Sequence, residues 1–171
     1  MTDAAPNAPD GARVLWLSGT EFKNGAIEVE ITGEPGPNAD AQARGFVGLA
    51  FRAASNGSHY ECFYLRPTNG RADDQVRRNH SVQYISYPDF PWQRLRKEFP
   101  EKYESYCDLV AGEWTNVRIE ARGTTGLLYV NGASQPTLVV NDLKLGETNG
   151  GIGLWIGPGT VAHFADLRVS Q

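Results

Sequence analysis

Arginine and aromatic side chains are concentrated in one segment of this sequence, residues 66–106. The segment holds six of the 12 arginines and seven of the 18 aromatic residues. Aromatic rings offer stacking faces and arginine offers a planar fork of donors, so together with Gln, Asn and Asp they suit a hydroxyl-rich, sugar-like ligand. A loop this long is uncommon in a compact domain unless it has a function. We therefore expect the functional site in this segment.

Three side chains of the segment are candidates for acid/base chemistry: Asp74, His80 and Glu98. Asp74 follows Asp73 in a loop with Gly and Asn, where an acid can cap a turn, pair with a nearby arginine or act as a general acid or base. A lone histidine is more often a hydrogen-bonding structural residue than a catalyst. The sequence does not select among these uses.

Other reactive groups are few. No pair of histidines has zinc-ligand spacing, and serine-hydrolase and phosphate-loop motifs are absent. Asp142 and Asp166 could donate oxygens to a structural calcium, with surface solubility as the alternative use; apart from that calcium we expect no cofactor. Cys62 and Cys107 predict two free thiols, and the alternative is a single disulfide that pins the end of the segment to a strand.

Composition limits the class of protein and its partners. The 171 residues, 40% hydrophobic and 21% charged, predict one soluble domain over residues 13–171 after a disordered or extended tail over residues 1–12. The net charge of −4 disfavours nucleic acid, and no apolar run is long enough to cross a membrane. No signal peptide is visible at the start, so a cytoplasmic location and a removed leader both remain open.

Alternation of apolar and polar residues predicts strands along most of the chain. A hairpin is expected around Asn56-Gly57, an edge strand over residues 135–143, and a bulge near Ala165, where the alternation shifts phase. The one helix candidate, residues 92–106, contains Pro100 and should form one or two short turns at most. Eight to ten short strands at this spacing predict an antiparallel two-sheet sandwich or barrel.

The strings YLRPTNG, DDQVRRNHSVQY, PWQRLR, GEWTNVRIEARG, LYVNG, QPTLVVNDLK, GGIGLWIG and HFADLRV together resemble concanavalin A-like lectin/glucanase (laminin G-like) jelly-roll domains. More narrowly, they resemble the bacterial domains grouped with 3-keto-disaccharide hydrolases. The likeness covers about residues 20–170 and implies an all-β, two-sheet jelly roll with a carbohydrate ligand on its concave sheet and bordering loops. The paired-carboxylate strand motif of the classical glucanases is absent, since residues 25–31 offer only Glu28 and Glu30. This departure argues against a retaining glycosidase.

One face of the predicted hairpin is apolar and should pack on the second sheet, which leaves arginines and tyrosines on the other face. These side chains suit a ligand groove, and the alternative is a solvated sheet face on which arginine stems cover tyrosine rings. The expected ligand-binding residues are Arg52, Tyr64, Arg66, Gln83, Tyr84, Tyr87, Trp92 and Trp155. This interpretation requires one concave pocket that contains Arg52, Arg66 and Gln83 together.

The sequence thus favours a carbohydrate-binding domain. An enzyme acting on glycosides or keto-sugars in the same groove, with Asp74, His80 or Glu98 as acid or base, is the first alternative. A protein-interaction module is the second, because Tyr, Trp and Arg are also common at interfaces. The identity of the sugar and the oligomeric state stay open.

Overall fold

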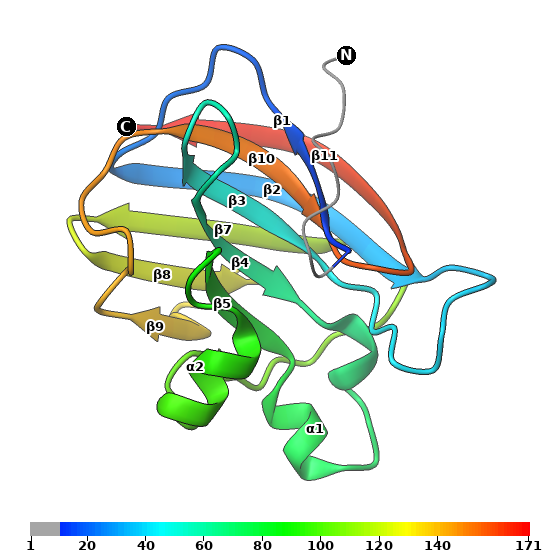
Figure 1. Ribbon diagram of the computed structural model, residues 1–171. Coiled ribbons are helices and arrows are strands. Elements are labelled where there is room, and N and C mark those ends of the chain that lie inside the picture. The colour runs from blue at the N-terminus through cyan, green and yellow to red at the C-terminus, as the bar shows by residue number, and fades with distance from the viewer. Residues whose placement is uncertain (1–10) are drawn as a thin grey trace.

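In the computed structural model, which describes residues 11–171, two antiparallel β-sheets pack face to face (Figure 1). Within these residues, the first sheet has six strands in the order β1 (Arg13–Trp16), β10 (Gly151–Ile156), β3 (Val47–Ala53), β4 (Tyr60–Leu65), β5 (Val82–Tyr87) and β6 (Glu104–Ser105). The second has five in the order β11 (Thr160–Ser170), β2 (Gly25–Pro35), β7 (Thr115–Arg122), β8 (Thr125–Val130) and β9 (Leu138–Val140). The predicted all-β, two-sheet sandwich is confirmed.

The core lies between the two sheets and follows the period-two pattern of the strands. Ile27, Val29 and Ile31 of β2 are 0–1% exposed, and Leu49 and Phe51 of β3 are fully buried. Burying a side chain of this size stabilises the fold by roughly 1.5–3 kcal/mol relative to leaving it in water. The alternation read from the sequence therefore identifies which face of β2 and of β3 up to Phe51 points inward.

Three local predictions are confirmed. β3 and β4 form a hairpin on either side of Asn56-Gly57, and β9 lies at the edge of its sheet. The pairing of β11 with β2 shifts register between Ala165 and Arg168, which is the bulge that the change of phase requires. Asp166 lies in this bulge with a φ of 53°.

The segment 66–106 has more regular structure than a loop. It contains a short 3₁₀ turn, η1 (Pro67–Asn69), then α1 (Gln75–Asn79), β5, α2 (Trp92–Glu98) and β6. β5 escaped the sequence analysis because nearly all of it is buried on both faces, which removes the alternation of apolar and polar residues. α2 is the predicted short helix, and it ends at Glu98, just before Phe99 and Pro100, because a residue that precedes proline disfavours the helical conformation.

The structure also tests the predictions for the N-terminal tail and the two cysteines. Of the predicted tail, residues 1–10 lie outside the described residues, whereas Ala12 is buried and directly precedes β1. Cys62 is buried on β4 and Cys107 is half-buried after β6; within the described residues no disulfide joins them, as predicted. Among residues 11–171, no helix is long and apolar enough to span a membrane.

Candidate functional site

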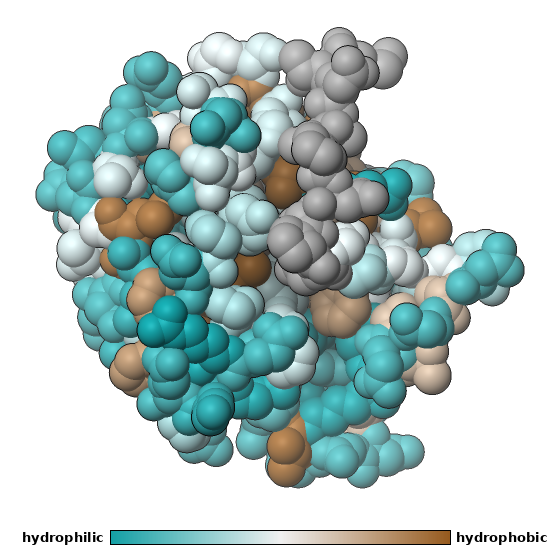
Figure 2. Space-filling view, in the orientation of Figure 1, coloured by the Kyte–Doolittle hydropathy of each residue, from teal (hydrophilic) through white to brown (hydrophobic). Residues whose placement is uncertain are grey.

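A groove with a volume of about 550 Å³ opens at one end of the six-stranded sheet. Residues 40–46 form one wall, and η1, α1 and the start of α2 form the others, where the two helices lie beside the sheet in Figure 1. The surface over these helices is largely hydrophilic (Figure 2). The groove is lined by Asp40, Gln42, Ala43, Arg44, Phe46, Arg66, Asn69, Asp74, Val76, Arg77, His80, Trp92, Arg96 and Pro158. We call it the arginine groove.

Under the groove, the face of the sheet that points away from the core carries a row of paired residues: Trp155, Gly48, Tyr64 and Gln83. A Cβ atom on Gly48 would lie only 2.6 Å from the Cβ of Tyr64. Because glycine leaves this space open, the Tyr64 ring stacks on Trp155, with centroids 4.6 Å apart and planes at 23°. Burial raises the pKa of Tyr64 to about 12, so its hydroxyl stays protonated. This row is a buried floor below the residues that line the groove.

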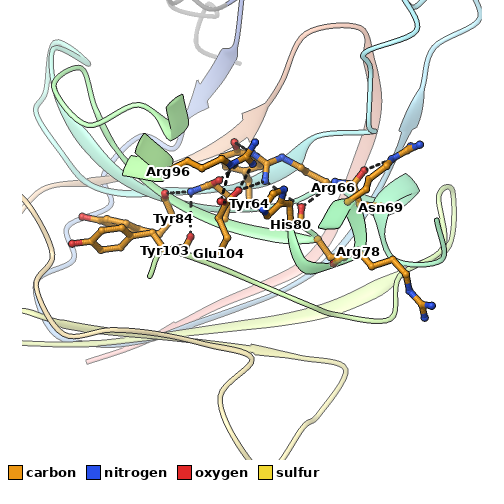
Figure 3. A network of polar contacts seen from close by, with 12 residues as sticks. Tyr64, Arg66, Asn69, Arg78, His80, Tyr84, Arg96, Tyr103 and Glu104 are labelled. Carbon is orange, nitrogen blue, oxygen red and sulfur yellow. Dashed lines mark hydrogen bonds and ion pairs between the residues drawn. The ribbon is translucent and has the colours of Figure 1, made fainter. Parts of the chain in front are cut away.

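Arg66 connects this floor to the groove (Figure 3). Its Nη2 donates to the hydroxyl of Tyr64 at 2.9 Å and to Oε1 of Gln83 at 3.0 Å. Its Nη1 donates to Oε1 of Glu104 at 3.0 Å and to the carbonyl of His80 at 3.1 Å. Arg66 itself is only 5% exposed. Four hydrogen bonds thus fix the plane of one guanidinium at the base of the groove.

Glu104 of β6 joins two of the arginines. Besides Arg66, it accepts hydrogen bonds from Arg96, with 2.9 Å between Nε and Oε2 and a second, short contact from Nη2. Burial favours the neutral acid, but the hydrogen bonds from Arg96 and the charge of Arg66 outweigh it and hold the pKa of Glu104 below its ordinary value. Figure 3 shows the carboxylate between the two guanidinium groups. It remains charged and orients both of them.

Trp92 of α2 supplies an aromatic wall. Its ring lies under the guanidinium carbon of Arg96 at 4.6 Å and of Arg66 at 5.7 Å. Phe46, which also lines the groove, packs edge-on against Tyr64 with ring centroids 6.2 Å apart. The groove therefore combines flat apolar surface with a fixed set of planar donors.

The three candidate acids and bases have different positions. Asp74 and His80 both line the groove, whereas Glu98 lies on the exposed side of α2 and pairs with Arg94 at 2.9 Å. Asp74 caps α1, since its Oδ1 accepts the backbone N–H of Arg77 at 2.8 Å. The structure thus brings two of the three together in one groove and gives Asp74 a capping role.

Burial lowers the pKa of His80, and the positive charges of Arg96 and Arg66 lower it further, against the opposing effect of Glu104. Its Nε2 lies 3.7 Å from Oε2 of Glu104. The imidazole is therefore mainly neutral at pH 7.

Of the predicted ligand-binding residues, Arg66 and Trp92 line the groove, whereas Tyr64, Gln83 and Trp155 are buried in the sheet below and do not line it. Arg52, Tyr84 and Tyr87 lie elsewhere. Arg52 is fully buried near the hairpin turn, with a φ of 51°, and donates to the carbonyls of Lys23 and Gly146. It sits at the opposite end of the hairpin from Arg66, because antiparallel pairing places Phe51 beside Glu61. A register shift of β3 against Gly151 and Gly153 breaks the alternation here, and the Arg52 side chain contacts Lys23 and Asn24, just before β2. The required pocket with Arg52, Arg66 and Gln83 is absent from the described residues.

The two misplaced tyrosines have structural contacts. Tyr84 points into the core, where its hydroxyl donates to Oε2 of Glu61 at 2.6 Å, and burial raises the pKa of both groups. Tyr87 stacks on Tyr60 with centroids 4.9 Å apart, at the end of β5 remote from Gln83. Since β5 was not recognised as a strand, the direction of its side chains was not available from the sequence.

The calcium candidates lie on opposite edges of the five-stranded sheet. Asp142 follows β9 and Asp166 lies in β11. Burial opposes ionisation of Asp142, but hydrogen bonds from Lys144, Tyr103 and Lys102 lower its pKa to about 2. Among residues 11–171, no three His, Cys, Asp or Glu side chains are arranged to hold a metal ion. The two acids do not share a site.

Sequence reasoning missed Glu104, Arg44, Phe46 and Arg77. Arg77 and Glu104 lie within the segment 66–106, but no short motif distinguishes them from neighbouring charges. Arg44 and Phe46 reach the groove from residues 40–46, which read as the end of a loop and the start of a strand. Only the packing of that wall against η1 and α1 brings them to the site.

No protein-family model matches the sequence, and no curated protein matches it. Solved structures do match its fold. The carbohydrate-binding module CBM66 from Bacillus subtilis is 16% identical, with a TM-score of 0.65, over 96% of this chain and 84% of that one. Galectin LEC-6 of Caenorhabditis elegans is 13% identical, with a TM-score of 0.54, over 97% and 100%. A tetrameric galectin from the ball sponge Cinachyrella sp. is 14% identical, with a TM-score of 0.53, over 94% and 99%.

At these identities the likeness concerns the fold. It confirms the two-sheet jelly-roll sandwich expected from the sequence, and the matching structures include a carbohydrate-binding module and galectins. The narrower resemblance to 3-keto-disaccharide hydrolases stays a prediction.

Proposed function

We propose that this chain is a carbohydrate-binding domain and that the arginine groove is its saccharide site. The observation that carries the proposal is the position of Arg66, whose guanidinium is held by four hydrogen bonds between the sheet floor and the groove. A sugar ring presents hydroxyls around its edge and C–H groups on its faces. Planar donors fixed beside an aromatic wall match both parts of such a ligand.

The fold supports the same function. Structures named as a carbohydrate-binding module and as galectins share this sandwich. The groove volume of about 550 Å³ also lies in the usual range for small-ligand sites. Because the guanidinium groups of Arg44, Arg66 and Arg77 are already held by hydrogen bonds, binding requires little rearrangement of the site.

A glycan array with the purified chain tests the proposal, followed by calorimetric titration of each glycan bound. We expect Trp92→Ala to weaken binding about tenfold or more, because stacking on an aromatic ring contributes on the order of 1.5 kcal/mol. Trp114→Ala is the matched control, since Trp114 is 53% exposed in the turn before β7 and does not line the groove. Equal loss of binding in both variants would contradict the assignment of the site.

The hydrolase alternative rests on His80, which is half-buried, lines the groove and has a pKa below its ordinary value. A neutral imidazole can accept a proton from a substrate or a water. Monosaccharide release from a 3-keto-disaccharide, abolished by His80→Ala, would support it. Binding without turnover, retained in His80→Ala, supports the binding domain.

A further inference from the structure

The charge of the groove indicates which chemical class of saccharide would bind there. The side chains that line it include four arginines and two aspartates, although the whole chain carries a net charge of −4. The side chains that line the groove therefore carry an excess of positive charge. The partners of each charged group show how much of that charge is already neutralised.

Two of the arginines are paired with an acid and two are not. Arg66 and Arg96 share the carboxylate of Glu104. Among the described residues, Arg44 and Arg77 have no carboxylate within ion-pair distance, and their hydrogen bonds go to neutral acceptors. Arg44 donates to the carbonyls of Ala41 and Ala43 and to the amide of Gln42.

Arg77 is held in the same way. Its Nε donates to Oδ1 of Asn69 at 2.9 Å, and its Nη2 donates to the hydroxyl of Thr68 at 3.2 Å and to the Thr68 carbonyl at 3.5 Å. These contacts fix the orientation of the guanidinium without neutralising it. Fixed, uncompensated arginine forks are the groups that proteins use to bind carboxylates and other oxyanions.

The two aspartates of the groove are engaged with the backbone. Oδ1 of Asp40 accepts the N–H of Gln42 at 2.6 Å, and Oδ1 of Asp74 accepts the N–H of Arg77 at 2.8 Å. Burial lowers the pKa of Arg44, and the nearby charge of Arg77 lowers it further, against the effect of Asp40. The arginines therefore repel one another across the groove, and an anion bound between them would relieve this repulsion.

We propose that the saccharide bound in the arginine groove is acidic and that its carboxylate or sulfate ester lies between Arg44 and Arg77. This inference rests on the proposed function and adds to it the chemical class of the ligand. Arg66 and Trp92 contact the sugar ring, and the two unpaired arginines select its negative charge.

Pairs of polymers that share one sugar backbone but differ in charge distinguish recognition of the charge from recognition of the sugar. Polygalacturonate and its fully methyl-esterified form differ only in the free carboxylate, and dextran sulfate and dextran differ only in the sulfate. Calorimetric titration of the chain with all four polymers, at about 20 mM and about 300 mM salt, is the experiment. We expect at least one acidic polymer to bind about tenfold more tightly than its neutral partner, with the difference shrinking at high salt.

Variants show where the charge is recognised. Arg44→Gln and Arg77→Gln should each remove about tenfold of the affinity for the acidic polymer and lower the affinity for neutral sugars by less. Arg77→Lys retains the positive charge but lacks the planar pair of donors, so its affinity for the acidic polymer should lie between those of wild type and Arg77→Gln. Arg122→Gln is the charge-matched control, since Arg122 is exposed on β7 of the other sheet.

Three outcomes would overturn the inference. Neutral polymers or neutral array sugars that bind at least as well as acidic ones would refute acidic selectivity but leave the proposed function intact. Equal losses in Arg122→Gln and Arg77→Gln would show that net charge, and not the groove, attracts the polymer. Failure to bind any acidic polymer refutes the inference, and failure to bind any glycan of the array as well refutes the proposed function.

Discussion

Replacing Glu104 by glutamine tests whether a buried carboxylate organises the arginine groove. Glu104 is 7% exposed and Arg66 is 5% exposed, with 3.0 Å between Oε1 and Nη1. Glutamine keeps the shape of the side chain and one acceptor but removes the negative charge. Arg66 then remains in a poorly solvated place without its ion-pair partner. Removing one member of a buried ion pair costs about 3–5 kcal/mol.

We expect the lower end of that range, a loss of about 3 kcal/mol, because Arg66 keeps its hydrogen bonds to Tyr64, Gln83 and the His80 carbonyl. Urea unfolding at pH 7, followed by tryptophan fluorescence, measures the change in the free energy of unfolding by linear extrapolation. Unfolding must be two-state in both proteins for the comparison to hold.

Glu98→Gln is the matched control. Glu98 pairs with Arg94 at 2.9 Å, but both side chains are more than 40% exposed and lie four residues apart on α2. Such a pair contributes about 0.3–0.5 kcal/mol. If Glu104→Gln loses no more stability than Glu98→Gln, Glu104 does not hold Arg66 in place and the reasoning for a rigid site fails.

Three further predictions concern Glu104, Tyr84 and Gly48. The pKa of Glu104 is lowered in the folded state, so the charged carboxylate stabilises the fold above the unfolded-state pKa of about 4.3. This stabilisation is lost as the pH falls through the folded-state pKa. Acid unfolding curves should therefore be shallower in Glu104→Gln than in wild type. Tyr84→Phe leaves Oε2 of the fully buried Glu61 without this donor and should cost about 1–3 kcal/mol in urea unfolding. Gly48→Ala places a Cβ against Tyr64 and should cost about 1–3 kcal/mol, whereas an unchanged stability would show that the floor can move.

The sequence predicted the sandwich because its half-buried strands alternate cleanly. Ile27, Val29 and Ile31 of β2 are buried, and Glu28 and Glu30 between them are partly exposed. The bulge near Ala165 was also predictable, since a change of phase along one strand requires an inserted residue. β1 and β5 were missed, because β1 is four residues long and β5 is buried on both faces.

The site was predicted only in part, because alternation gives the face of a residue but not its position along the sheet. Of the residues placed on the outer face of the hairpin, Arg66 lines the groove and Tyr64 is buried below it. Arg52 was placed on the same face, but a bulge breaks the alternation there, and the antiparallel register puts it beside the turn, at the other end of the strands. Counting residues from Asn56-Gly57 would have separated Arg52 from Arg66 on the sequence alone. Glu104 and Arg44 required the tertiary structure, since no local pattern places them near Arg66.

The four arginines of the groove are of two kinds: two form ion pairs with Glu104 and two form no ion pair. We expect the first kind to matter for stability and the second for binding. Arg66 and Arg96 share the single charge of Glu104, so removing that acid should destabilise the fold. Arg44 and Arg77 repel each other and form no ion pair, so their charges contribute little to the stability of the empty groove. Arg77→Gln should therefore change the affinity for an acidic sugar far more than the free energy of unfolding. A loss of stability as large as that of Glu104→Gln would mean that Arg77 serves the fold and leaves no charge for a ligand.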